Sequence, residues 1–227
     1  MPALNPWPYF LNVIFSLDIR KIWGFYYFTF NEDISSCCIP FQGILRAIYF
    51  NKMFKSRTSI FINLFLVYIN WFAVAILAGQ GRPFLALIPS LGVVGLHLFI
   101  TSPPQRVREI KVILAAAVVG LIVETFFLHA GIIDYAAEDL LWGYLPPLFM
   151  IGLWLAFSTT FKTSLFWLHS RILLSAGIGF LVSGPSYYAG EKLGALILAR
   201  PYLESLSLIG IVWCVAFPLL LFLSRRI

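Results

Sequence analysis

The chain has 227 residues, of which 60% are hydrophobic and 11% are charged, and its formal net charge is +6. Soluble domains carry about 25% charged residues, so this composition excludes a single soluble core. Several apolar runs reach the ~20 residues needed to cross a bilayer, and the mean hydropathy is +0.89. The basic residues are spread over short loops rather than forming a stripe beside aromatic side chains, which argues against a nucleic-acid partner.

The first 52 residues differ from the rest of the chain. Asp18, Arg20 and Lys21 separate two apolar runs, so we expect no membrane span here. Two interpretations stay open: an aromatic-rich interfacial extension, or a native chain that begins at Met53, just before the first long apolar segment. Residues 1–52 therefore form an N-terminal extension, and residues 53–227 form the membrane domain.

Length and charge predict that the membrane domain is an all-α, polytopic transmembrane helical bundle of about six spans. The expected spans are residues 59–79, 83–101, 112–131, 141–161, 171–190 and 206–224. A tight turn is expected at residues 80–83, and an acidic loop is expected between the third and fourth spans.

Lysine and arginine are distributed unevenly between the two sides of this arrangement. One side carries ten of them: Lys52, Lys55, Arg57, Arg106, Arg108, Lys111, Lys162, Arg171, Arg225 and Arg226. The other side carries three: Arg82, Lys192 and Arg200. Cytoplasmic loops are enriched in basic residues, so both ends of the six-span domain are expected in the cytoplasm.

Small residues recur every four positions in the fifth expected span and just after it. The two sets are Ser175, Gly179 and Ser183, then Ser186, Gly190 and Gly194. This spacing lets helix backbones approach closely in a bilayer. The intervening Gly184-Pro185 predicts a bend, because proline removes a hydrogen bond of the helix. We therefore expect a bent, closely packed helix at the centre of the bundle.

Glu124 is the only carboxylate well inside an expected span. A carboxylate in hydrocarbon must be paired, hydrated or protonated, so it marks either a functional site or a bond that fixes helix packing. Ala116, Gly120 and Glu124 share one helix face, so the acid should point to a close neighbour. No other span has an interior lysine or arginine, so we expect its partner to be a hydroxyl or carbonyl group on another helix.

His97 is the second candidate for chemistry, and it shares a helix face with Ser90 and Thr101. A lone histidine in this setting is more often a structural hydrogen-bonding group than a base or ligand. It lies at a different depth from Glu124, which argues against a direct pair. The chain has none of the familiar hydrolase, zinc-protease or nucleotide-binding motifs, and its cysteines form no ligand pattern. We expect neither a metal nor a cofactor.

One group of residues between positions 146 and 195 carries a family resemblance. It comprises Pro146, Pro147, Trp154, Phe157, Thr160, Ser164, Trp167, Gly184, Pro185, Tyr187, Gly190 and Gly194. With these residues the chain resembles a family catalogued as a domain of unknown function, number 2878, from about residue 62 to 197 or beyond. The resemblance implies a small bacterial inner-membrane protein that is associated with envelope lipid-modifying enzymes. It supplies no catalytic residues.

Three functions remain open at this stage. The first is an accessory protein that binds membrane lipids or a partner enzyme around the fifth span. The candidates for binding or packing are Trp154, Thr160, Ser164, Trp167, Gly184, Pro185, Tyr187, Gly190 and Gly194. The second is an enzyme that acts on a lipid with Glu124 as acid or base, and the third is a small transporter in which Glu124 relays protons. The first hypothesis requires no catalytic group or transport pathway beyond the residues named, so it is the preferred one.

Overall fold

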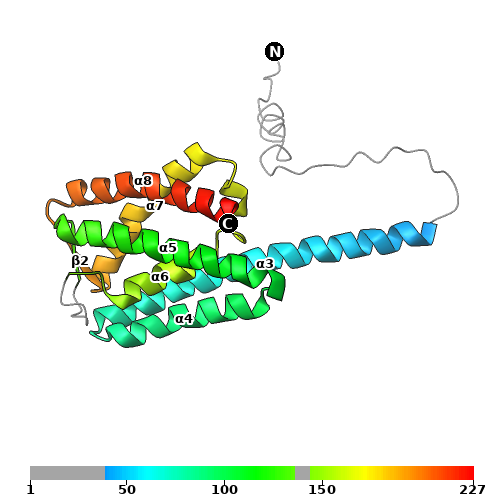
Figure 1. Cartoon of the computed structure of the whole chain (residues 1–227), viewed down its shortest axis with the longest axis horizontal. Coiled ribbons are helices and arrows are strands. Elements are labelled where there is room, and N and C mark those ends of the chain that lie inside the picture. Colours follow the sequence, from blue (N-terminus) through cyan, green and yellow to red (C-terminus); the bar gives the residue numbers. More distant parts are fainter. Residues whose placement is uncertain (1–38, 136–143) are drawn as a thin grey trace, which may run out of the picture. The chain divides into compact units, whose positions relative to one another are not determined.

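The computed structural model describes residues 39–135 and 144–227, with side chains described from residue 59 onward (Figure 1). In chain order the elements are α3 (Ile39–Gly79), α4 (Pro83–Ile100), α5 (Pro103–His129), β1 (Ile133–Tyr135), α6 (Leu148–Ser158), η1 (Phe166–Leu168), α7 (Ile172–Lys192), β2 (Leu196–Leu198) and α8 (Tyr202–Arg226). Within these residues, α4, α5, α7, α8 and the Ser59–Gly79 part of α3 are long and apolar enough to cross a membrane. The expected all-α membrane bundle is confirmed.

Two of the expected connections are well defined. The turn at residues 80–83 is confirmed: Gly81 has φ +71°, and the Arg82 N–H donates to the Leu77 carbonyl at 3.0 Å. The connection between the second and third expected spans is shorter than predicted, because α5 begins at Pro103, nine residues before the third expected span. Proline is favoured in the first turn of a helix, so the basic stretch before residue 112 is helical rather than a loop. Residues 1–38 and the acidic segment 136–143 lie outside the described residues.

The fourth expected span is shorter as a helix than predicted. α6 has 11 residues, about 17 Å of helix, against a hydrocarbon core of about 30 Å. It ends where three successive hydroxyls donate to carbonyls three residues back: Ser158, Thr159 and Thr160. Such bonds compete with the helix ladder. The chain then continues in turns to Ser164, whose hydroxyl donates to Asn63 near the start of the α3 span. The segment made of α6 and these turns therefore still runs from one end of the bundle to the other.

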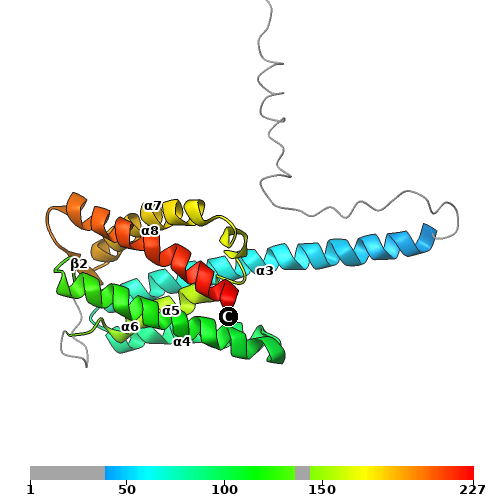
Figure 2. The ribbon, with the colours of Figure 1, turned by 45° about the horizontal axis from the view of Figure 1, so that its top comes forward.

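α7 and α8 form the most extensive helix–helix contact in the described part of the chain (Figure 2). A Cβ atom added at Gly179 would lie 2.5 Å from the Trp213 carbonyl oxygen. One added at Gly210 would lie 2.9 Å from the Phe180 ring. The close backbone approach predicted for the first set of small residues is therefore confirmed. α7 continues as one helix through Pro185.

Two short strands, β1 and β2, were not expected from the sequence. β1 and β2 pair antiparallel, with Asp134 opposite Ile197, and the Ala199 N–H extends the ladder to the Ile132 carbonyl at 3.0 Å. Both strands lie in segments that were expected to be loops. Their pairing ties the connection after α5 to the connection after α7, and it holds Tyr135 at the end of the bundle.

Candidate functional site

Glu124 of α5 is 0% exposed, and its carboxylate accepts three hydrogen bonds from three other elements. Tyr135 Oη of β1 donates to Oε2 at 2.7 Å. Trp154 Nε1 of α6 and Tyr187 Oη of α7 donate to Oε1 at 2.9 and 2.5 Å. These four residues are called the Glu124 cluster below. No basic side chain among the described residues forms an ion pair with Glu124, so its partners are neutral donors.

Gly120 brings Trp154 to the carboxylate. A Cβ atom at Gly120 would lie 2.3 Å from Trp154 Cγ, so the indole ring lies directly against the backbone of α5. Gly120 is one turn before Glu124 on the same face, which is why a ring packed on the glycine can donate to the acid. The close neighbour that the Ala116/Gly120/Glu124 face predicted is therefore a side chain, the indole of α6.

Aromatic contacts fix the three donors. Trp154 stacks on Trp213 of α8, with ring centroids 4.7 Å apart and planes at 16°. The Tyr187 ring meets Phe127 edge-on at 5.7 Å, and the Tyr135 ring meets Phe149 at 6.3 Å. Offset stacked and edge-to-face pairs are favourable ring geometries. The donors are therefore held in place from several directions, and the carboxylate is the point on which they converge.

Two effects act on the Glu124 carboxyl in opposite directions. Burial disfavours its ionised form, and three hydrogen bonds donated to its oxygens favour it. Burial first, and then the charge of Glu124, raise the pKa of the Tyr135 hydroxyl well above its usual value. Tyr135 therefore keeps its proton, and remains a donor to Glu124, across the physiological pH range.

Next to the cluster is an apolar cavity of about 960 Å³. Glu124, Trp154 and Tyr187 form part of its wall, and most of the remaining wall is aromatic or aliphatic. Small-molecule pockets typically measure about 300–1,000 Å³, so the cavity is at the large end of that range. Its lining also includes Phe65 of α3 and Leu181 of α7, which are exposed on the outer apolar surface. The cavity thus borders the surface that faces lipid.

Polar and backbone contacts join α3 to the rest of the bundle at both ends of its span. At one end, Thr163 and Ser164 donate to Asn63 Oδ1 at 2.7 and 2.6 Å. At the other end, a Cβ atom at Gly79 would lie 1.9 Å from the Leu193 carbonyl oxygen, and one at Gly194 would lie 3.4 Å from Gly79 Cα. Most of the α3 lining of the cavity lies between these two contacts, because it runs from residue 61 to residue 75.

His97 is not part of this site. Its Nε2 lies 3.2 Å from Glu109 Oε2, a buried carboxylate that the sequence analysis did not single out. Thr101 Oγ1 donates to the His97 carbonyl at 2.7 Å, and Ser90 Oγ donates to Asn70 Oδ1 at 3.2 Å. The polar residues of that α4 face therefore have separate partners. His97 and Glu124 do not form a pair, in agreement with the difference in depth.

The remaining candidates of the fifth expected span take different positions. Pro185 and Gly190 line the cavity, and a Cβ atom at Gly190 would lie 3.3 Å from a methyl group of Leu196. Gly184 faces α8, where its added Cβ atom would lie 3.6 Å from the Leu206 carbonyl oxygen. Gly194 has φ +80° and follows the end of α7, so the second set of small residues does not continue along one helix.

The candidates between α6 and α7 lie in the turns that join these helices. The Thr160 hydroxyl donates to the carbonyl of its own turn, and Ser164 contacts α3 as described above. Trp167 is partly exposed, and the Arg171 guanidinium carbon lies 5.6 Å from its ring centroid. A partly exposed tryptophan beside an arginine is typical of the membrane–water interface.

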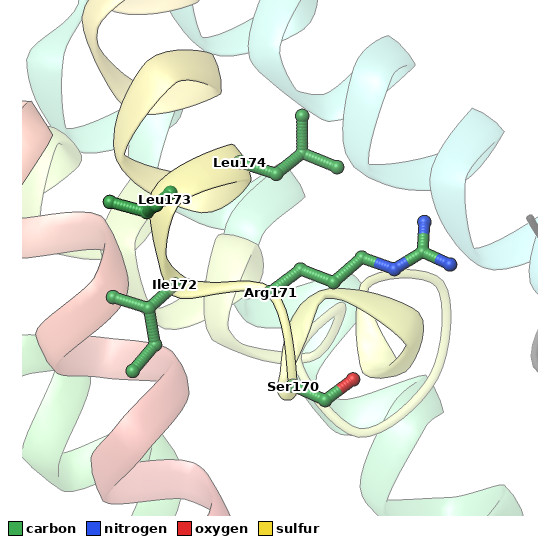
Figure 3. Close-up of a pocket in the computed structure, with 5 residues that line it drawn as sticks. All are labelled: Ser170, Arg171, Ile172, Leu173 and Leu174. Carbon is green, nitrogen blue, oxygen red and sulfur yellow. The ribbon is translucent and has the colours of Figure 1, made fainter.

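A smaller hollow of about 400 Å³ lies at the start of α7. It is lined by residues 170–174, and Figure 3 shows the Arg171 side chain extending to one side of the chain while Ile172 points to the other. It contains no carboxylate. The larger cavity, which the Glu124 cluster borders, is therefore the candidate site.

Two residues of this site were missed from sequence. Tyr135 lies in a segment expected to be a loop, and nothing in its neighbourhood indicates contact with α5. Trp213 carries a signal that was not used: it lies inside the α8 span, whereas tryptophans of membrane proteins concentrate at the interfaces. A tryptophan inside a span indicates a specific packing or binding role.

Among the described residues, no group of three or more His, Cys, Asp or Glu side chains is placed to hold a metal. No curated protein and no solved structure matches the chain. A family model matches residues 60–219, a range that includes the Glu124 cluster and all the candidate residues named above. This confirms the resemblance identified from the sequence. The chain belongs to the family described as protein of unknown function (DUF2878).

Proposed function

We propose that this protein is an integral membrane protein that holds an apolar molecule of lipid size in the cavity beside the Glu124 cluster. The cavity carries the proposal: its volume is about 960 Å³, its wall is almost entirely apolar, and part of its lining lies on the lipid-facing surface. A lipid chain can enter such a cavity directly from the bilayer without crossing water, and the apolar wall suits an apolar ligand.

The Glu124 cluster has a structural role in this proposal. Its three donors come from β1, α6 and α7, so one carboxylate fixes the relative positions of the elements that form one side of the cavity. An envelope lipid-modifying enzyme is the partner that such a lipid-holding protein would serve.

A cavity-filling substitution tests the proposal. Ser183 lines the cavity, so Ser183→Phe is expected to remove most of the lipid that co-purifies with the full chain in detergent. Gly177→Phe adds the same ring to the same helix at a position where an added Cβ atom meets no atom within 4 Å, and it should leave the bound lipid unchanged. Native mass spectrometry of the two purified variants gives the amount bound. Equal retention by both variants would contradict the proposal.

We also propose a location in the inner membrane of a bacterium, with the chain end after α8 in the cytoplasm, from the uneven distribution of basic residues. In a variant whose native cysteines are replaced, Gln80→Cys should react with a membrane-impermeant maleimide in intact spheroplasts. Ser102→Cys should react only after the membrane is opened. Both positions are exposed and lie in the turns at opposite ends of α4, so equal labelling would disprove this topology.

A lipid-modifying enzyme is the second candidate function, and one observation favours it. Glu124 and Tyr187 both line the cavity, so a carboxyl and a phenol would lie beside any bound lipid. A proton-transferring residue must lie within hydrogen-bond reach of the reacting group, so a lipid-modifying reaction would require one of these two groups to contact the ligand in the cavity. The Glu124 substitutions in the Discussion separate catalysis from structural support.

A further inference from the structure

Some residues of the cavity wall are also exposed on the outer surface, and they mark where the cavity opens. They lie on two helices: Phe61, Leu64, Phe65, Tyr68 and Phe72 of α3, and Leu181, Val182 and Pro185 of α7. The lining residues of α5, α6 and α8 are buried or partly buried. The cavity therefore opens sideways between α3 and α7, toward the hydrocarbon of the bilayer.

Two contacts of α3 define the ends of the cavity. At the Asn63 end, Thr163 and Ser164 donate to the Asn63 side chain. At the Gly79 end, the backbone of Gly79 packs against that of Leu193. The lining residues toward the Gly79 end are buried: Ala75, Gly190, Ala195 and Leu196. The cavity is therefore closed to lipid at the Gly79 end.

The opening extends from the Asn63 end to the middle of the membrane. On α3 it begins at Phe61, which is 70% exposed, and ends at Phe72, about 16 Å further along the helix. That length is close to the ~15 Å depth of one leaflet. On α7, Leu181 is 69% exposed and lies near the middle of the helix. A lipid chain that enters by this opening therefore comes from the leaflet at the Asn63 end.

The surface at the Asn63 end carries several basic groups. Leu165, which lines the cavity, lies in the turns between Lys162 and Arg171. Burial first, and then the positive charges of Arg225 and Lys162, lower the pKa of His169 in the same turns. Lys162 and Arg225 therefore lie near one imidazole, although they come from different parts of the chain.

Acidic side chains are distributed in the opposite way. Among the side chains described, Glu109 is the one acid at the Asn63 end, and it is buried with its Oε2 3.2 Å from His97 Nε2. The Gly79 end carries Asp134, Glu191 and Glu204. Each basic residue near the surface favours an anionic lipid by about 1 kcal/mol. The Asn63 end therefore suits an anionic head group.

The cavity itself suits only the apolar part of such a lipid. Its wall includes the carboxyl of Glu124, and none of the described residues that line it is Lys, Arg or His. A phosphate group inside would have no compensating cation and would be strongly disfavoured at that depth. The head group therefore stays at the membrane surface while a chain enters the cavity.

We infer that the ligand is an anionic phospholipid of the leaflet at the Asn63 end, which inserts an acyl chain between α3 and α7 and keeps its head group at the basic surface beside Lys162 and Arg171. This inference rests on the proposed lipid-holding function and specifies its ligand and the route of entry. In the topology proposed above, this leaflet is the cytoplasmic one.

Two phospholipids with the same chains test the head group: phosphatidylglycerol, which is anionic, and phosphatidylcholine, which is zwitterionic. Native mass spectrometry of the full chain in detergent should show about tenfold tighter binding of phosphatidylglycerol, the effect of one or two basic residues. Lys162→Gln together with Arg171→Gln should remove most of this preference, and Lys162→Gln alone should lower it severalfold if the double variant does not fold. Lys192→Gln together with Arg200→Gln removes the same two charge types at the Gly79 end and should keep the preference.

Substitutions on α3 test the route of entry. Leu64→Trp enlarges a side chain of the opening, so exchange of bound phosphatidylglycerol for its chain-deuterated form should slow severalfold. Ile76→Trp is the control, because Ile76 has similar exposure on the same helix but lies outside the cavity lining toward the Gly79 end. It should leave the exchange rate unchanged.

The possible failures have different meanings. Equal binding of the two phospholipids by the unmodified chain, or a preference that depends on Lys192 and Arg200 instead, would overturn the head-group assignment. Exchange that is slowed by Ile76→Trp and not by Leu64→Trp would overturn the route of entry. Each of these results would leave the lipid-holding function intact, whereas failure of the unmodified chain to bind either phospholipid would refute that function itself.

Discussion

Glu124→Leu is expected to lower the free energy of unfolding by about 3 kcal/mol, because it leaves three buried donors without an acceptor at roughly 1 kcal/mol or more each. Leucine fills at least the volume of glutamate, so the change removes hydrogen bonds without opening a large void. The donors are Tyr135, Trp154 and Tyr187, which come from three separate elements. The midpoint of thermal unfolding in detergent measures the loss.

Glu124→Gln is expected to remain close to the unmodified protein in stability. Trp154 Nε1 can only donate, so the glutamine oxygen must occupy the position of Oε1, where it also accepts from Tyr187. Its amide nitrogen then faces the Tyr135 hydroxyl, which can accept as well as donate. All three contacts can form with a side chain that does not exchange a proton.

The pair of variants therefore separates the two candidate functions. If Glu124 only supports the cavity, the Gln variant should hold lipid as the unmodified chain does, and the Leu variant should lose both stability and lipid. If Glu124 is a catalytic acid or base, the Gln variant should fold and hold lipid but abolish any change in the lipid composition of cells that produce it. Glu204→Leu, at an exposed carboxylate of α8, is the control for loss of a negative charge. A Leu variant that is as stable as this control and that still holds lipid and changes the lipid composition of cells as the unmodified chain does would exclude both roles.

The parts of the fold that were predictable from sequence are those set by local composition. Apolar length defines the spans, small residues at every fourth position predict that α7 has a close helix neighbour, and an isolated carboxylate in a span identifies Glu124. Each of these signals lies within one segment of about 20 residues. A bilayer makes them reliable, because it forces backbone hydrogen bonds to close within each helix.

The partners of Glu124 were not predictable in the same way. Tyr135, Trp154 and Tyr187 lie 11, 30 and 63 residues away in sequence, and their convergence depends on β1–β2 pairing and on helix packing. The early end of α6 has a similar cause. Hydroxyls such as those at residues 158–160 can bond back to carbonyls of their own helix, but whether such bonds end the helix depends on the surrounding contacts, here those of Ser164 with α3.

Gly120→Ala tests the packing of the Trp154 ring against the backbone of α5. The added methyl group would lie 2.3 Å from Trp154 Cγ, so the indole must move away from α5. That movement weakens its bond to Glu124 and its stacking on Trp213. Overpacking and the lost hydrogen bond together should lower the free energy of unfolding by about 2–4 kcal/mol. The near-ultraviolet circular dichroism of the tryptophans should change with it.

Two comparisons attribute this loss to the indole. Gly95→Ala makes the same change in α4, where an added Cβ atom meets no atom within 4 Å, and it should be neutral or stabilise the helix by up to about 1 kcal/mol. Gly120→Ala introduced together with Trp154→Ala should cost far less than Gly120→Ala alone, because the ring that the methyl group meets is absent. If the glycine substitution costs the same in both backgrounds, the backbone of α5 rather than its contact with Trp154 is the sensitive element. In that case Gly120 does not position the donor at Glu124.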